Sequence, residues 1–237
     1  GRLFITGLSF STPAVNIITI RYDQTPVYTV PDLQNEVPAS NFHFYENKGQ
    51  LIDVNGNVIP GIKYYTENTP QKLYFSDTTL SYVFARVDTL AATIDTLHRV
   101  DMILNNSNEH ATINSNEAGT DRLNYFLGYI PNPVTDVRGF KQLTIPDIYN
   151  GIDLQYTSNQ NGLKYYFVVK QPFGGNPRDI EIFYAGATSI TTAANTLTVN
   201  TPLGSFNLEA HAYQVNPVGN IIPLSWNPAY NVVGTNT

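Results

Sequence analysis

A short polar motif, ENKGQ at residues 46–50, brings together side chains that could hold a ligand. It offers a carboxylate, an ammonium group and two amides, which can hydrogen-bond a sugar or a peptide. The ligand-binding candidates in this motif are Glu46, Asn47, Lys48 and Gln50. The same residue types also make turns, with Glu46 and Lys48 paired locally and Gln50 bonded to the backbone. The motif therefore predicts either a binding cluster or a corner of the fold, and the corner is favoured.

Paired carboxylates would indicate a different chemistry, because hydrolysis of a glycosidic bond needs two of them about 5 to 9 Å apart across a cleft. The candidates are Glu46, Asp53, Asp101, Asp147 and Asp153. Asp147 and Asp153 flank the sequence IYNGI and could meet across that turn. Such pairs arise by chance among 19 acidic residues, and Asp153 is expected to accept hydrogen bonds from turn amides instead. We therefore predict no catalytic residue, and an enzyme is the less favoured interpretation.

The sequence offers few ligands for a metal ion. It contains no cysteine, and its four histidines stand singly, without the spacing of a zinc site. Calcium is a better match, because the stretch DVNGN carries oxygen ligands on Asp53, Asn55 and Asn57. The regular acidic ladder of a calcium-binding loop is missing from this stretch, so an ordinary Asn-Gly turn is favoured over a calcium site. No other cofactor is predicted.

Tyrosine is frequent, with 16 residues, and most of them fall in segments that have the pattern of strands. Adjacent pairs such as Tyr64–Tyr65 and Tyr165–Tyr166 must send one ring to each face of a sheet. Exposed rings would suit a sugar ring or a protein partner, which makes Tyr165 and Tyr166 further ligand-binding candidates. The alternative is that these rings pack the core and rims of a sandwich, with their hydroxyls reaching water.

The overall charge argues against two classes of partner. Only 14% of the residues are charged, the net charge is −6 and the isoelectric point is near 5.1. Nucleic acids and anionic membranes bind basic surfaces, so neither is expected as a partner. No run approaches the roughly 18 apolar residues of a membrane-spanning helix, and no membrane insertion is predicted. Gly1, with no initiator methionine and no signal-like segment after it, suggests a processed chain or a fragment.

The elements that must position these residues are strands. Period-two runs bounded by Asn-Gly, Gly or Pro recur along the chain, whereas no segment sustains helical spacing of its apolar residues. We predict an all-β protein, an antiparallel β-sandwich or larger supersandwich with little or no helix. Residues 1–40 form an N-terminal strand pair with a proline-rich lead, and residues 41–237 form the main domain. The clearest hairpin turns at Asn161 and Gly162, and residues 105–121 are expected to form a solvated loop or weak hairpin.

Several motifs occur in an order that resembles one bacterial family. They are ENKGQ, HRVDMILNN, LNYFLGYIP, IYNGIDLQY, LKYYFVV with NPRDIEIFYAGA, and LTVNTPLGSF with HAYQ. This order is similar to the N-terminal β-domain of large secreted proteins of Bacteroidota type, which often carry SBBP β-propeller repeats. The resemblance covers residues 42–225 and implies surface display, adhesion or binding, with no catalytic motif. Residues 1–30 resemble a partial SBBP propeller blade, or alternatively supply edge strands to the main domain.

These patterns together predict a non-catalytic domain of a secreted bacterial protein, at an extracellular or outer cell-surface location. It is expected to mediate adhesion or assembly through contacts with other protein subunits or cell-surface components. The alternative is a carbohydrate-binding module or a glycan-active hydrolase, for which glycans would be the partners. An exposed aromatic platform without paired carboxylates would favour carbohydrate binding, two close carboxylates in a groove would favour hydrolysis, and a flat edge strand would favour assembly.

Overall fold

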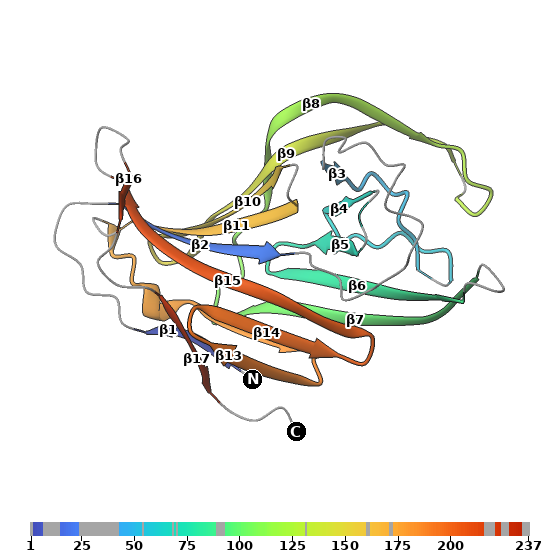
Figure 1. Ribbon diagram of the computed structural model, residues 1–237. Coiled ribbons are helices and arrows are strands. Elements are labelled where there is room, and N and C mark those ends of the chain that lie inside the picture. The colour runs from blue at the N-terminus through green and yellow to red at the C-terminus, as the bar shows by residue number, and fades with distance from the viewer. Residues whose placement is uncertain are drawn as a thin grey trace.

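The computed structural model of the chain (Figure 1) describes residues 2–6, 15–23, 43–53, 55–67, 69, 71–88, 93–130, 132–159, 162–170, 173–215, 221–223 and 228–233. Apart from the short 3-10 helix η2 (Pro177–Asp179), every named element is a strand, and every pairing between strands is antiparallel. The predicted all-β, antiparallel fold class is therefore confirmed. Within the described ranges, no helix has the length and apolar character needed to cross a membrane.

The first of two sheets contains nine strands, which pair in the order β8, β9, β10, β11, β2, β15, β14 and β13, with β16 beside one end of β15. Their bounds are β8 (Asn114–Tyr125), β9 (Val134–Tyr149), β10 (Ile152–Asn159), β11 (Gly162–Lys170), β2 (Val15–Asp23), β15 (Gly204–Val215), β14 (Thr196–Thr201), β13 (Ser189–Ala193) and β16 (Ile221–Pro223). The predicted hairpin is present as β10 and β11, whose pairing runs from Ile152↔Val169 to Asn159↔Gly162, so Gly162 begins β11 and is not part of the turn as predicted.

The second sheet pairs in the order β3, β4, β5, β6, β7, β12, β1 and β17. Its strands are β3 (Phe44–Glu46), β4 (Tyr64–Thr66), β5 (Lys72–Phe75), β6 (Thr79–Asp88), β7 (Thr93–Asn105), β12 (Glu181–Ala185), β1 (Arg2–Thr6) and β17 (Ala229–Val233). β3 also pairs with β9, so the two sheets are joined along that long strand.

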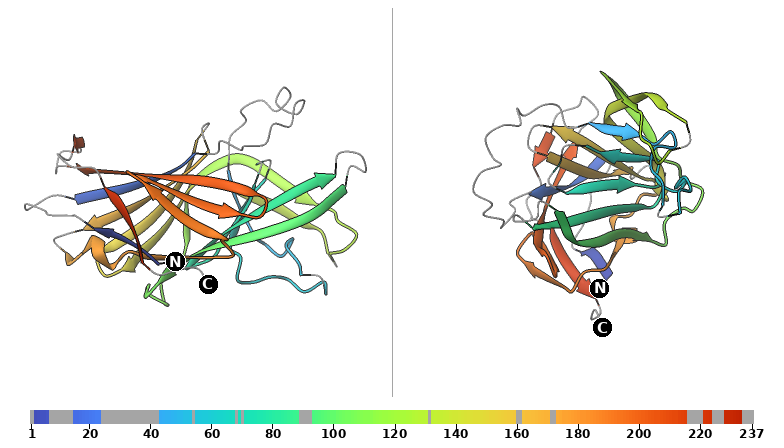
Figure 2. Two further views of the ribbon diagram at one scale, coloured as in Figure 1. Left: turned by 60° about the horizontal axis from the view of Figure 1, so that its bottom comes forward. Right: turned by 90° about the vertical axis from the view of Figure 1, so that its right-hand side faces the viewer.

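The core lies between the sheets and is rich in aromatic rings. Tyr82 on β6 stacks on Phe206 of β15 with 4.8 Å between ring centroids, and Phe75 on β5 meets Tyr156 on β10 edge to face at 5.1 Å. Each of these pairs joins one sheet to the other, as expected of a sandwich whose inner faces interdigitate. The two views in Figure 2 show the sheets curling around this shared interior.

The N-terminal strands belong to the same two sheets as the rest of the chain. β1 lies between β12 and β17, and β2 lies between β11 and β15. Residues 2–6 and 15–23 therefore supply interior strands, rather than the edge strands that the sequence suggested as one alternative. The proline-rich lead before residue 40 and the predicted domain boundary at residue 40 fall outside the described residues, and the boundary stays a prediction.

The segment 105–121, expected to be a loop or weak hairpin, is a loop over residues 106–113, but residues 114–121 form the first part of the strand β8. β8 pairs with β9 on one side only, with register shifts that mark β-bulges, and most of its side chains face solvent. A one-sided edge strand buries little apolar surface, and charges and bulges on it discourage pairing with other chains. Its Asn, Ser and Glu content is therefore compatible with a strand, although the same composition alone predicts a loop.

Candidate functional site

The ENKGQ motif forms a corner at the end of β3, and Asn47 holds the returning chain. The side-chain amide of Asn47 donates hydrogen bonds to the carbonyl oxygens of Ile59 and Ile62 at 3.1 and 2.9 Å. Its side-chain oxygen accepts from the backbone N–H of Gly49 at 3.1 Å. The side chain of Asn47 therefore stabilises the loop that connects β3 to β4.

Gln50 is the buried centre of the corner, with only 3% of its surface exposed. Its amide donates to the carbonyl of Glu46 at 2.8 Å and to the hydroxyl of Tyr65 at 2.9 Å, while its oxygen accepts from the backbone N–H of Lys48 at 2.7 Å. The Tyr65 hydroxyl lies 2.6 Å from that of Tyr125 on β8. Burial raises the pKa of both tyrosines, so each hydroxyl stays neutral and can donate.

Glu46 and Lys48 do not pair with each other but both reach across to β9. One carboxylate oxygen of Glu46 accepts from the backbone N–H of Arg138 at 2.9 Å. The ammonium of Lys48 donates to the carbonyls of Thr135 and Asp136 at 3.0 and 3.3 Å. The motif is therefore a clasp between β3 and β9, with intramolecular partners for each of its four polar side chains. Ligand binding by these residues stays a prediction.

The clasp anchors an arm, residues 118–130 and 132–140. It is formed by the parts of β8 and β9 that run past β3 and by the described residues of the segment that connects them. Tyr45, Tyr65 and Val137 form a small second core under it, with Leu123 and Tyr125 of β8 packed against them. Figure 1 shows the arm reaching toward the side of the molecule opposite β16. The base of the arm is thus held by both hydrogen bonds and apolar contacts.

Two aromatic rings stand exposed at the end of this arm, and we call them the aromatic tip: Phe126, 73% exposed, and Tyr129, 62% exposed. Ile130 beside them is buried, and its backbone N–H donates to the carbonyl of Leu127 at 3.1 Å, which closes a turn. The tip therefore presents apolar rings on a backbone that is already ordered. Isolated exposed apolar residues are common, but two large exposed rings close together in sequence at a projecting turn make this tip a candidate interaction surface.

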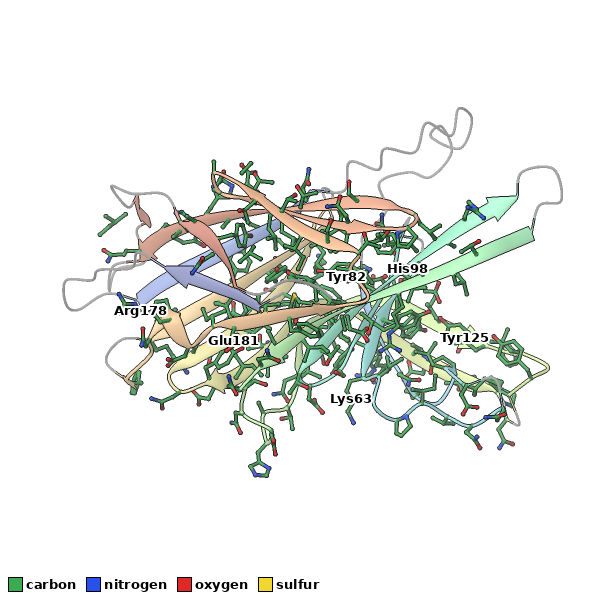
Figure 3. All side chains as sticks on the ribbon, turned by 90° about the horizontal axis from the view of Figure 1, so that it is seen from below. Lys63, Tyr82, His98, Tyr125, Arg178 and Glu181 are labelled. Atoms are coloured by element: carbon green, nitrogen blue, oxygen red, sulfur yellow. The ribbon has the colours of Figure 1, made fainter. Side chains whose placement is uncertain are left out.

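A polar groove lies at the other end of the sandwich. One hollow of about 700 Å³ is lined by Asn108, Asp147, Asn150, Gly151, Lys170 and Phe173. A neighbouring hollow of about 470 Å³ shares two of these residues and adds Asn106, Ser107, Tyr149, Arg178, Asp179 and Glu181. We call the two together the end groove. Figure 3 shows Arg178 and Glu181 near this end, and Tyr125 toward the aromatic tip.

Asp147 and Asp153 meet across the IYNGI turn, as the sequence suggested, but they meet on Lys170. The Lys170 ammonium lies 2.9 Å from Asp147 and 2.7 Å from Asp153, and Asp153 also accepts from the backbone N–H of Asp147 at 2.8 Å. Burial lowers the pKa of Lys170, but the hydrogen bonds and charges of the two carboxylates raise it overall. The two acids therefore neutralise a cation, and Asp153 also holds the backbone N–H of Asp147 near the end of β9.

One close backbone crossing and one buried carboxylate shape the end groove. Gly151 has φ +63°, and a Cβ atom there would lie 2.5 Å from the backbone nitrogen of Gly175. Beside this crossing, Glu181 is buried and accepts from the side-chain amides of Asn105 and Asn106 at 3.2 and 3.1 Å. Three loops that are distant in sequence are thereby fixed against one another.

The remaining candidates from the sequence neither line the end groove nor belong to the aromatic tip. Tyr165 is fully buried between the sheets, which removes it from the surface, whereas Tyr166 is half-buried with the Lys164 ammonium 5.1 Å from its ring centroid. Asp53 accepts from the backbone N–H groups of Asn55 and Asn57, each at 2.8 Å, and these hydrogen bonds lower the pKa of Asp53.

Asp53, Asn55 and Asn57 therefore make an Asx-type turn, and calcium binding there stays a prediction. In the part of the chain that the structure describes, no group of three or more His, Asp or Glu side chains is arranged to hold a metal ion.

Sequence reasoning missed the aromatic tip and the exposed ring of the end groove. Phe126 and Tyr129 stand in FLGYIPNP, and Phe173 stands in QPFGGNP. In both stretches the aromatic residue is surrounded by Gly, Pro and Asn, which predict turns at the surface. An aromatic residue within a stretch rich in Gly, Pro and Asn would have predicted these exposed rings.

A family model described as a domain of unknown function, DUF7948, matches residues 44–230. This range includes the ENKGQ clasp, the arm and the end groove. No curated protein and no solved structure matches the chain.

Proposed function

The chain belongs to the DUF7948 family of domains, and from that premise we propose that it is a non-catalytic domain of a secreted or cell-surface protein that docks onto a protein partner through its aromatic tip. The observation that carries this proposal is the exposure of Phe126 and Tyr129 at the end of an anchored arm. Tyr and Phe are enriched in the centres of protein interfaces, where burying a ring contributes more than most contacts.

The anchoring of the arm supports a docking role. A tip on a loose loop would have to lose conformational entropy on binding, which weakens affinity. Here the clasp and the small core under the arm order its base, and the turn at Leu127 and Ile130 orders its end. The two rings are therefore held in place before a partner arrives.

The secreted setting is supported by the family resemblance. The composition, with few charges and many tyrosines, suits a β-domain. The order of motifs from ENKGQ to HAYQ is similar to that of domains in large secreted bacterial proteins. In such a protein, the aromatic tip would bind a neighbouring domain or subunit.

The test is site-specific crosslinking followed by a binding measurement. The photoreactive residue p-benzoylphenylalanine replaces Tyr129 in the cell that produces the protein, and replaces Phe173 at the other end as the matched control. We expect a discrete crosslinked protein from position 129 only. The purified partner should then bind the wild-type chain, and the double change Phe126→Ala and Tyr129→Ala should weaken binding by about tenfold or more. Equal crosslinking at both positions, no crosslink at 129, or unchanged affinity would overturn the proposal.

A further inference from the structure

The end groove presents several polar side chains that are not bonded to any other described residue. The side chains of Asn150, Arg178 and Asp179 make no hydrogen bond or ion pair with another residue of the described ranges. At the ENKGQ clasp, by contrast, each polar side chain has one. A hollow with uncommitted donors and acceptors is the arrangement expected of a ligand site.

The exposed ring of Phe173 stands at this groove. It is 73% exposed, although it belongs to a segment held closely against the β9–β10 turn. The backbone N–H of Lys170 donates to Gly151 at 2.8 Å, and that of Gly175 donates to Lys170 at 3.2 Å. The ring is therefore displayed from a fixed backbone and offers a flat apolar face to a ligand.

The polar groups of the groove suit hydroxyls. Asn150 both donates and accepts, Arg178 donates, and Asp179 accepts, so together they match groups that can do both. A phosphate, sulfate or carboxylate could only accept.

The charge around the groove also argues against an anion. Lys170 and Arg178 are outnumbered by four carboxylates, those of Asp147, Asp153, Asp179 and Glu181, which leaves a negative excess. An anionic ligand would be repelled by that field.

We propose that the end groove binds a neutral oligosaccharide. Phe173 packs against the face of a sugar ring, while Asn150, Arg178 and Asp179 hydrogen-bond its hydroxyls. The volume of about 700 Å³ in the larger hollow lies in the range of roughly 300 to 1,000 Å³ common for small-ligand sites. This site lies at the opposite end from the aromatic tip, so it is independent of protein docking there.

The experiment begins with an array that carries neutral, sialylated and sulfated oligosaccharides together with basic peptides. The neutral oligosaccharide that binds best is then titrated by calorimetry into the wild-type chain and its variants. We expect Phe173→Ala and Arg178→Ala each to weaken binding by about tenfold, because each removes a direct contact. Phe173→Trp should retain binding, since it keeps a flat ring.

Phe126→Ala is the matched control, because Phe126 is as exposed as Phe173 but lies at the other end. It should leave saccharide affinity within about twofold of wild type. The proposal is overturned by an array on which only sulfated or sialylated glycans or basic peptides bind, by a blank array, or by Phe173→Ala binding as well as wild type. A failure here leaves crosslinking at Tyr129 unaffected, so the two proposals are tested separately.

Discussion

Replacing Gln50 with leucine should loosen the clasp that anchors the arm. The change keeps a side chain of similar size in a site with 3% exposure, but removes the amide group that Gln50 contributes to the corner. Three hydrogen bonds disappear, those to the Glu46 carbonyl, the Tyr65 hydroxyl and the Lys48 N–H. The apolar volume is kept, so the loss measures the hydrogen bonds rather than a cavity.

The loss in the free energy of unfolding depends on whether each former partner of Gln50 finds another hydrogen bond. A hydrogen bond contributes about 1 kcal/mol net, and a buried group left without a partner costs about 1 to 3 kcal/mol. The Tyr65 hydroxyl keeps its contact with Tyr125, and the Lys48 N–H can reach water because Lys48 is exposed. The Glu46 carbonyl loses its side-chain donor. We therefore expect the free energy of unfolding to fall by about 2 to 4 kcal/mol, and the melting temperature by roughly 5 to 15 °C.

The assay is urea unfolding followed by far-ultraviolet circular dichroism. Gln155→Leu is the matched control, because Gln155 lies half-buried on β10 and its side chain makes no hydrogen bond within the described residues. It should change the free energy of unfolding by less than about 1 kcal/mol. If Gln50→Leu were as stable as that control, the hydrogen bonds of Gln50 would not hold the corner, and the account of the clasp would be refuted.

Two further predictions concern the glycine crossing and the buried tyrosines. Gly151→Ala should lower the free energy of unfolding by about 3 kcal/mol or more, because the added Cβ would clash with backbone atoms. Gly56→Ala is the control, since Gly56 has φ +84° but open space around it, and it should lower the free energy by only about 1 kcal/mol. Equal losses in urea unfolding would contradict the close crossing at Gly151. Burial raises the pKa of core tyrosines such as Tyr165 and Tyr184 above the ordinary value near 10. Above pH 10 the unfolded chain releases these protons while the folded chain keeps them, so stability should fall by about 1.4 kcal/mol per pH unit for each such tyrosine. The free energy of unfolding is measured at increasing pH. A value that stays level to about pH 11 would refute the raised pKa of these tyrosines.

The sequence by itself determined the features that depend on neighbours along the chain. The period of two in apolar residues specifies strands, and within the adjacent pair Tyr165 and Tyr166 it sends one ring inward and the other outward. The β10–β11 hairpin follows from two such runs on either side of an Asn-Gly. The use of Asp153 to accept a nearby backbone N–H was also predictable, because acceptor and donor lie six positions apart, although the donor Asp147 belongs to β9 and not to the turn. Each of these features is decided by local stereochemistry.

Tertiary structure alone decided which distant groups meet. Glu46 reaches the N–H of Arg138, 92 positions away, and nothing near Glu46 in the sequence indicates that strand. β8 is a strand only because β9 offers it hydrogen bonds, although its own composition predicts a loop. The end groove likewise needs loops around residues 106–108, 147–151 and 173–181 to converge. A local pattern specifies the face and turn of a residue, but its partner depends on the register of long-range pairing, which is settled when the whole sandwich packs.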